Sequence, residues 1–179
     1  MFFQKVSPKG LIIQRFLIRI NSWVFLLKKI IIVYDSMFGN TKRVAEVIGE
    51  SMSEVKKMEV LVKEIKHVQP MEIIDYDMIL IGSPNHMGGP TRSIKKFIDK
   101  LGKSGIVGKN VAVFDTYVKK NVGKTVRKME KRINQKVSGL IIIIAGLSVK
   151  VGGVRGPVEE EELPRCMTFG KKIANQIID

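Results

Sequence analysis

A short polar turn, which separates an apolar run from a helix-like segment, carries donors that could bind a phosphate group. Residues 35–41 read Asp-Ser-Met-Phe-Gly-Asn-Thr and contain neither Lys nor Arg. Ser36 and Thr41 can donate hydroxyl hydrogen bonds, and Asn40 can donate an amide one. Gly39 permits a close approach of the backbone or a positive φ. A phosphate monoester would therefore be bound here by uncharged donors alone.

The elements on either side of this turn would place it where an anion is stabilised. Residues 30–34 form an apolar, β-branched run that is typical of a strand buried on both faces. Beyond the turn, apolar residues share one face of a predicted helix, namely Val44, Val47, Ile48 and Met52. The first N–H groups of a helix have no intrahelical partner, and the helix dipole adds positive charge there. Strand, hydroxyl-rich turn and helix start together predict a phosphate cradle.

Residues 32–45, closed by Ile48, resemble the FMN phosphate-binding signature of the flavodoxins. That pattern has a hydrophobic strand end, Ser or Thr, two spacers, Gly, one spacer, Thr and, four residues further on, Ala. Every fixed position is met, and the similarity is to the short-chain, clostridial type. The alternative is an ordinary strand-to-helix turn capped by Ser36 or Asn40. The resemblance implies that the cofactor is FMN and that its phosphate contacts the turn: Ser36, Met37, Phe38, Gly39, Asn40 and Thr41.

The rest of the chain alternates between predicted strands and amphipathic helices. We predict strands at 30–34, 58–65, 77–81, 110–114 and 140–145, helices beginning near residues 41, 91 and 122, a short helix at 70–76 and a last helix at 163–177. This alternation implies an α/β fold with a parallel sheet covered on both faces. Right-handed crossovers restrict the topology, and five strands fit the flavodoxin-like three-layer α/β/α arrangement of order 2-1-3-4-5. In that order a ligand binds beyond the carboxyl ends of the first and third strands.

Two further loops complete the site that the resemblance implies. In flavodoxins the loops after strands three and four enclose the isoalloxazine ring. Met87-Gly88 resembles the Met-Gly pair that flanks the flavin N5, and residues 88–89 supply the backbone freedom that a peptide flip needs. A plain turn with two Gly residues is the alternative. Residues 115–117, Asp-Thr-Tyr, resemble the family's Gly-Ser-Tyr, and Tyr117 is the best candidate to stack on the ring. The implied ring-side residues are Pro84, Asn85, His86, Met87, Gly88, Gly89, Asp115, Thr116 and Tyr117.

One departure from the family concerns the ring. Val118 and Lys119 stand where flavodoxins often have a Trp, so the identity of the stacking residue stays open. Lys119 and Lys120 are also unusual, because typical flavodoxins are acidic around the flavin. Positive charge near the ring would favour the anionic reduced flavin and raise its potential.

The net charge of +14 is high, and residues 1–28 contribute +5 of it without a single acidic residue. A basic surface attracts acidic partners. The bases are spread along helix faces without a recognition motif, which argues against nucleic acid as a partner. The one cysteine, Cys166, excludes a disulfide framework and a Cys-rich metal site, and it suits a reducing cytoplasm. We expect it to be a small core residue of the last helix.

The N-terminal segment, residues 1–27, stays outside the pattern. Its apolar stretch, residues 11–27, is too short and too charged to span a bilayer, since a central Arg costs about 2.5–3.5 kcal/mol on insertion scales. It also lacks the uninterrupted apolar core and cleavage site of a signal peptide. Three interpretations are open: a basic helix on a membrane surface, an extra helix packed on the domain, or a disordered or non-native leader. We favour the leader, and expect 28–179 to be the flavodoxin-like FMN-binding domain.

The resemblance implies an electron carrier rather than an enzyme. We expect it to shuttle single electrons between redox partner proteins, acidic ones among them, as a cytoplasmic monomer or weak dimer. The first alternative is an FMN-dependent NAD(P)H or quinone reductase, whose relatives usually carry longer loops than this chain has. The second is a flavin-free domain that keeps the fold. No catalytic residue or metal ligand is expected, and residues 123–125 only mimic the end of a P-loop, because Val118 stands where its first Gly belongs.

Overall fold

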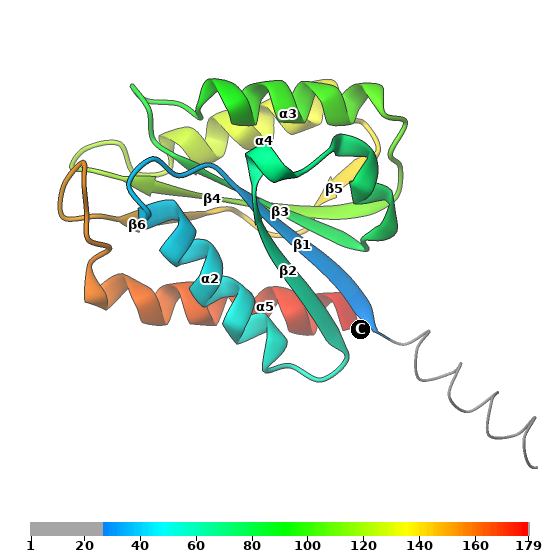
Figure 1. Cartoon of the computed structure of the whole chain (residues 1–179), viewed down its shortest axis with the longest axis horizontal. Coiled ribbons are helices and arrows are strands. Elements are labelled where there is room, and N and C mark those ends of the chain that lie inside the picture. Colours follow the sequence, from blue (N-terminus) through cyan, green and yellow to red (C-terminus); the bar gives the residue numbers. More distant parts are fainter. Residues whose placement is uncertain (1–26, 179) are drawn as a thin grey trace, which may run out of the picture.

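The computed structural model describes residues 27–178 as three layers, with a parallel sheet between two pairs of helices (Figure 1). The strands are β1 (Lys28–Tyr34), β2 (Met58–Glu64), β3 (Met78–Pro84), β4 (Lys109–Tyr117), β5 (Leu140–Ile142) and β6 (Leu147–Lys150). The α-helices are α2 (Asn40–Ser53), α3 (Arg92–Lys103), α4 (Lys124–Lys136) and α5 (Leu163–Ile178), and the 3₁₀ turns are η1 (Ile65–His67), η2 (Pro70–Asp75) and η3 (Glu160–Glu162). Apart from its last residue, the predicted N-terminal extension lies outside the described residues.

The sheet has the predicted order. Its strands are arranged β2-β1-β3-β4-β5, with β6 also paired to β4, and every pairing is parallel. The buried run of β1 shows why both faces need cover. Ile30 and Ile32 belong to the core under α2 and α5, whereas Ile31 and Val33 belong to the core under α3 and α4. Side chains of a strand alternate between faces, so an all-apolar run requires helices on both sides.

The fourth strand is longer than the sequence predicts. The prediction of a strand at 110–114 followed by a loop at 115–117 is wrong, because β4 runs to Tyr117. Asp is depleted in strands, so Asp115 ended the apolar pattern of the strand and hid the last three positions. Tertiary pairing overrides that preference, since Asp115 pairs with Ser83 of β3 on one side and with Ser148 of β6 on the other.

The edge strand is also broken. The sequence predicts one buried strand at 140–145, but two short strands, β5 and β6, pair with successive parts of β4. The break leaves backbone groups that helix side chains satisfy. Gln176 of α5 donates to the carbonyl of Ile143 at 3.0 Å, and the N–H of Gly146 donates to Glu130 of α4 at 2.9 Å. Because an edge strand has one neighbour only, side chains can replace the missing ladder bonds.

The helices match the predicted amphipathic faces closely. In α3 the hydroxyl of Thr91 accepts a hydrogen bond from the N–H of Ile94 at 3.3 Å, so Thr91 is the N-cap that the sequence predicts. Helix α4 begins two residues later than predicted, and Val122 is exposed before it. In α5, Cys166 is fully buried, as predicted. Between residues 27 and 178, no helix combines the length and the apolar character needed to cross a membrane.

Candidate functional site

A cavity of about 760 Å³ opens at the carboxyl ends of β1, β3 and β4. Its volume lies in the range of small-molecule and cofactor sites. Four segments line it: 35–41, 84–93, 116–121 and 151–154. The first three follow the strands that the topology brings together, and the last follows β6. The cavity therefore lies where a doubly wound sheet places its ligand.

The cavity lining includes most of the predicted site residues. Ten of them line it: Ser36, Met37, Phe38, Asn40, Thr41, Pro84, Asn85, His86, Met87 and Thr116. Five do not: Gly39, Gly88, Gly89, Asp115 and Tyr117. Sequence reasoning missed eight lining residues: Asp35, Thr91, Arg92, Ser93, Val118, Asn121, Val151 and Val154.

The turn between β1 and α2 has the geometry of an anion cradle. Gly39 precedes the helix with a φ of 83°, a left-handed conformation that other residue types adopt at a cost. Thr41 is 1% exposed, and its hydroxyl shares a hydrogen bond of 2.9 Å with the hydroxyl of Thr116. Ser36 Oγ is buried and has no hydrogen-bond partner among residues 27–178. A buried hydroxyl left unpaired costs about 1–3 kcal/mol, so this atom fits a ligand that supplies its partner. A phosphate oxygen at the start of α2 meets that requirement.

An acidic residue that the sequence analysis passed over links the cradle to the next helix. The hydroxyl of Thr91 donates to Asp35 Oδ2 at 2.6 Å while accepting from the N–H of Ile94. One hydroxyl therefore caps α3 and fixes the carboxylate at the end of β1. The two residues lie 56 positions apart, so no local pattern could have indicated the contact.

The segment after β3 closes on itself as a tight turn. His86 and Gly89 exchange backbone hydrogen bonds of 2.9 and 3.1 Å around Met87 and Gly88, whose φ values are 51° and 80°. Positive φ at both central positions is the mark of a type I′ turn. The N–H of Gly88 also donates to Asn85 Oδ1 at 2.8 Å. The turn holds Met87 in solvent, where it is 94% exposed, and keeps the two glycines beneath α4.

The end of β4 divides the predicted residues between two faces. Because strand side chains alternate, Thr116 points towards Thr41 and the cavity, while Asp115 and Tyr117 point to the other side. Tyr117 is 7% exposed and lies outside the cavity lining. Val118 borders the cavity instead. The strand that replaced the predicted loop thus brings only the middle residue of the three to the site.

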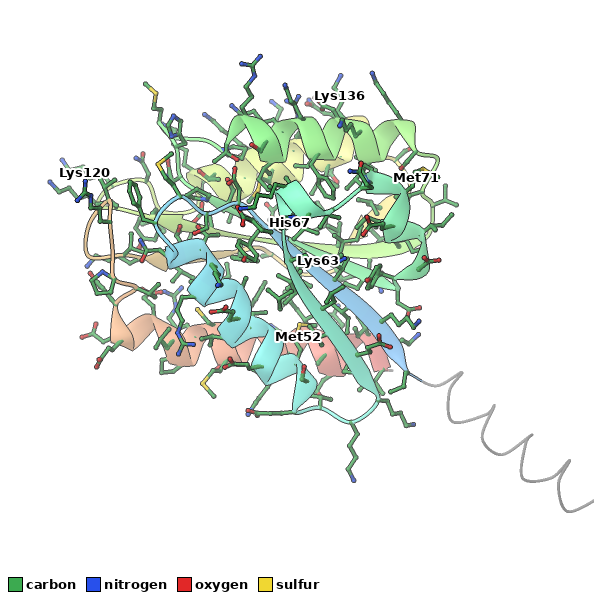
Figure 2. The ribbon with its side chains drawn as sticks, in the orientation of Figure 1. Met52, Lys63, His67, Met71, Lys120 and Lys136 are labelled. Carbon is green, nitrogen blue, oxygen red and sulfur yellow. The ribbon has the colours of Figure 1, made fainter. Side chains whose placement is uncertain are left out.

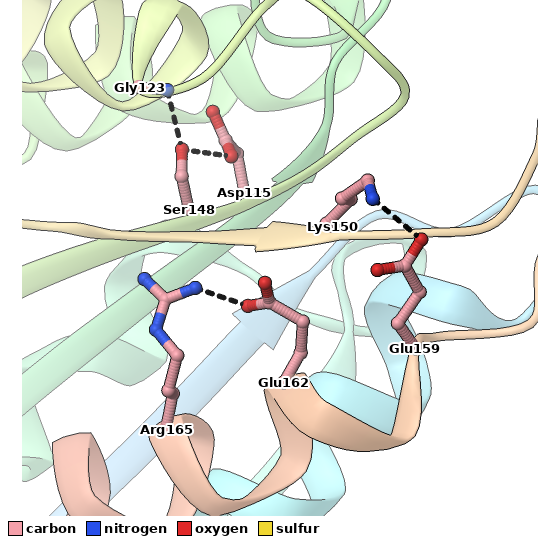
Figure 3. A network of polar contacts seen from close by, with 7 residues as sticks. All are labelled: Asp115, Gly123, Ser148, Lys150, Glu159, Glu162 and Arg165. Carbon is pink, nitrogen blue, oxygen red and sulfur yellow. Dashed lines mark hydrogen bonds and ion pairs between the residues drawn. The ribbon is translucent and has the colours of Figure 1, made fainter.

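Asp115 anchors the start of α4 rather than lining the cavity. Ser148 donates to Asp115 Oδ1 at 2.6 Å, and the N–H of Gly123 donates to Ser148 at 2.7 Å (Figure 3). The N–H of Val126 donates to Asp115 Oδ2 at 3.1 Å. Burial raises the pKa of Asp115 to about 6. The hydrogen bonds from Ser148 and from the backbone N–H groups of Val126 and Thr125 lower the pKa, but their effect is smaller than that of burial. The group ties β4, β6 and α4 together directly behind the cavity.

The loop after β6 returns to the cradle. Lys150 Nζ pairs with Glu159 at 3.0 Å at the base of this loop (Figure 3). Near its tip, a Cβ on Gly156 would lie 2.1 Å from Asn40 Oδ1, so only glycine leaves room for that amide. The guanidinium of Arg155 lies 6.0 Å from the ring centroid of Phe38. This loop therefore adds a wall to the cavity that the sequence did not assign to the site.

A metal site would need several ligating side chains close together. Within the described part of the chain, no three His, Cys, Asp or Glu side chains are placed to hold an ion together. The lining offers hydroxyl, amide, apolar and basic groups and one carboxylate, that of Asp35, which accepts a hydrogen bond from Thr91. That donor set suits an organic phosphate with a large apolar body.

Comparison with known proteins agrees with this geometry. The model of the flavodoxin domain matches residues 31–153. Flavodoxin from Clostridium saccharobutylicum is 26% identical over 155 residues, covering 83% of this chain and 97% of that protein. Flavodoxin from Aquifex aeolicus is 27% identical over 162 residues, covering 83% of this chain and 86% of that protein.

Solved flavodoxin structures share the fold over nearly their whole length. Flavodoxin 2 from Bacillus cereus superposes with a TM-score of 0.71 at 28% identity, covering 83% of this chain and 99% of that one. A flavodoxin from the domain Archaea superposes with a TM-score of 0.72 at 26% identity, covering 84% and 99%. The match of the domain model to more than half of the chain, on a fold with the cavity and cradle described above, shows that this chain belongs to the flavodoxin family of FMN-binding electron-transfer proteins.

Proposed function

We propose that this flavodoxin holds FMN in the cavity between the β1–α2 turn and the turn after β3, and carries single electrons between partner proteins. The observation that carries the assignment of the site is the buried Ser36 hydroxyl, which has no hydrogen-bond partner among residues 27–178 and lies beside the left-handed Gly39. FMN, when bound, supplies the chemistry by accepting and returning electrons, and the protein supplies binding, orientation and electrostatics.

The phosphate would be held by neutral donors at the start of α2. Ser36 and Thr41 offer hydroxyls, Asn40 offers its amide, and the first backbone N–H groups of the helix lack intrahelical acceptors. The hydroxyls of Thr41 and Thr116 share a hydrogen bond in which either can be the donor, and when Thr116 donates, the proton of Thr41 is free for a phosphate oxygen. Gly39 leaves open space above the turn, since a Cβ there would meet no atom within 4 Å. The helix dipole adds stabilisation of the phosphate charge.

The ring would occupy the opposite part of the cavity. Phe38, Met87, Val118 and Val154 offer apolar surface that excludes water from the ring faces. The type I′ turn presents the backbone of Gly88 at this end, and Asn85 holds that turn in place through its side chain. Asp115 and Tyr117 would act from behind, by fixing the end of β4 and the start of α4.

A carrier role fits the chain better than a reductase role. The segments after β3 and β4 are short, and the cavity mouth exposes Met37, Met87 and Val154 to partners. The basic surface favours acidic proteins among those partners. The single cysteine suits the reducing cytoplasm. We propose a monomer or weak dimer there.

Titration of the purified, acid-stripped protein with FMN tests the site. We expect binding with quenched flavin fluorescence, and a loss of about 1–3 kcal/mol of affinity in Ser36→Ala, because a buried donor to a charged group is removed. Ser93→Ala is the matched control, because Ser93 also lines the cavity but is an exposed residue of α3, outside the cradle. Equal losses in the two variants would remove the cradle from the site. Refusal of FMN by the parent protein would overturn the proposal, and rapid NAD(P)H oxidation by the loaded protein would favour a reductase.

A further inference from the structure

The two helix layers differ strongly in charge. Helices α3 and α4 together carry eleven basic and two acidic side chains, whereas α2, η3 and α5 together carry five of each. All eleven bases except Arg132 are exposed. Arg132 pairs with Asp99 across the two helices, and in the described part of the chain this is the one ion pair that involves either helix. The α3–α4 layer therefore presents a positive field that its own acids do not balance.

This field reaches the cavity mouth. Figure 1 shows that α3 and α4 begin at the edge of the sheet where β3 and β4 end. The cavity opens at that same edge. Arg92 at the start of α3 lines the cavity. A Cβ on Gly88 would lie 3.2 Å from Lys124 Nζ, and a Cβ on Gly89 would lie 3.5 Å from Lys128 Nζ. Two ammonium groups of α4 thus lie against the turn at the mouth.

The basic layer also extends beyond these first turns. In Figure 2, Lys120 points into solvent beyond the loops at the cavity end, and Lys136 marks the far end of α4. Both side chains are exposed. A long positive surface that ends at the cavity is suited to guiding a negatively charged partner towards it.

The mouth itself has an apolar centre. Met37, Phe38, Met87 and Val154 are exposed around the cavity opening, at 76%, 45%, 94% and 72%. By contrast, α3 and α4 expose no large apolar side chain at any of their positions, all of which the structure describes. An apolar centre with Met and an aromatic residue, bordered by Arg and Lys, is the composition of a protein–protein contact. A helix that binds lipid would instead carry an apolar stripe beside its basic face.

We propose that the cavity mouth and the α3–α4 surface form one docking face for an acidic protein, with Lys124 and Lys128 at the margin of the contact. The apolar centre meets the partner over the cavity, and the basic layer draws it there. The inference rests on the proposed function only in naming that protein as an electron-transfer partner. The docking surface itself depends on charge and shape alone.

Two haem proteins of opposite charge serve as probes, acidic cytochrome b5 and basic cytochrome c. Binding to the full chain at low ionic strength is measured by titration, and oxidation of the reduced, FMN-loaded protein is measured by stopped flow. The test variant is Lys124→Gln/Lys128→Gln. The matched control is Lys171→Gln/Lys172→Gln on α5, which makes the same charge change on exposed residues of the balanced layer.

We expect cytochrome b5 to bind and to react faster as salt is lowered, whereas cytochrome c does neither. The α4 variant should lose about tenfold in association rate and the α5 variant less than about twofold, because steering contributes factors of about 10 to 1,000. Equal losses in the two variants, or none in the α4 variant, would overturn the proposal. The proposal would also be overturned if the protein bound anionic vesicles or duplex DNA through Lys124 and Lys128 but did not bind cytochrome b5. The binding titration needs no flavin, so it decides the docking face even if FMN fails to load and the proposed function falls.

Discussion

The two ends of the cavity are built in opposite ways. The phosphate end comes from one continuous segment, the turn between β1 and α2, and its hydroxyls are buried and uncharged. The ring end is assembled from segments after β3, β4 and β6, and exposes the apolar Met87 and Val154 and the basic Arg92. Thr41, at 1% exposure, and Met87, at 94%, mark the extremes.

Because of this difference, we expect the phosphate end to determine the affinity for FMN and the ring end to determine the access of partner proteins. Buried dipoles act in a low dielectric, where a hydrogen bond to a phosphate is strong and salt has little effect. Exposed charges are screened within about 8 Å at physiological ionic strength, so they act on the encounter with partners. We therefore expect changes at the phosphate end to alter FMN affinity at any salt concentration. Changes at the ring end should alter stability or association rates instead.

The largest effect is expected from the group behind the ring end. The pKa of Asp115 is raised by burial from the ordinary 3.8 to about 6, so the folded state binds this proton more tightly than the unfolded chain. Its stabilising effect is therefore complete below pH 4 and is lost as the pH rises through 6, a change of about 3 kcal/mol at 1.36 kcal/mol per pKa unit. Urea unfolding of the parent and Asp115→Asn at pH 4, 5, 6 and 7 measures it.

Asp99 is the matched control for this pH dependence. The hydrogen bond from Arg132 lowers the pKa of Asp99, so its contribution has the opposite sign and is lost as the pH falls. Asp99→Asn should leave the fall in stability between pH 4 and 6 in place, while Asp115→Asn should remove it. A parent protein whose stability rises steadily across that interval, with no change in Asp115→Asn, would contradict the assignment.

At the phosphate end we expect a smaller effect, on affinity alone. Thr41→Val keeps the shape of the side chain but removes its hydroxyl, and should weaken FMN binding by about 1–3 kcal/mol. Thr116→Val removes only the partner of that hydroxyl, so it should cost less. Calorimetric titration at low and high salt compares the two variants. A larger loss in Thr116→Val would mean that Thr116, rather than Thr41, is the principal donor.

The contrast between the two ends also explains what the sequence could predict. The cradle is local, because strand, turn and helix follow one another within residues 28–53, and each carries its own pattern of burial and capping. The positive φ of Gly39 and the buried face of α2 follow from that pattern directly. The sheet order follows as well, since alternating buried strands and amphipathic helices leave few topologies.

The ring end is not local, and there the predictions were less complete. Asp115 and Tyr117 were expected in a loop, but pairing with β3 and β6 turns them away from the cavity. The wall formed by Val151 and Val154 depends on the fit of Asn40 against Gly156, which lies more than 100 residues further along the chain. Neither periodicity nor a motif encodes such a contact. The apolar run at 140–145 likewise cannot show that it lies at an edge, where the strand breaks.

Two glycines with positive φ, one at each end, separate backbone strain from contact. A Cβ on Gly39 would meet nothing within 4 Å, so Gly39→Ala should cost only the left-handed conformation, about 1–2 kcal/mol. We expect that cost in FMN affinity, because the cradle must keep its shape to bind. In Gly88→Ala the new Cβ also contacts Lys124, so this substitution should displace the turn at the ring end while leaving the phosphate contacts intact. Equilibrium titration of both variants with FMN and with inorganic phosphate distinguishes the two ends.

The smallest effect should come from the most exposed side chain of the mouth. Met87 is 94% exposed and contributes no packing to either core, so Met87→Ala should change the free energy of unfolding by less than about 0.5 kcal/mol. Met52, a fully buried residue of α2, is the contrasting position, and Met52→Ala should cost about 2–5 kcal/mol. Urea unfolding of both variants without FMN measures the two values. A loss in Met87→Ala that approaches the loss in Met52→Ala would mean that the mouth supports the fold, and access and stability would then no longer be separate properties of the two ends.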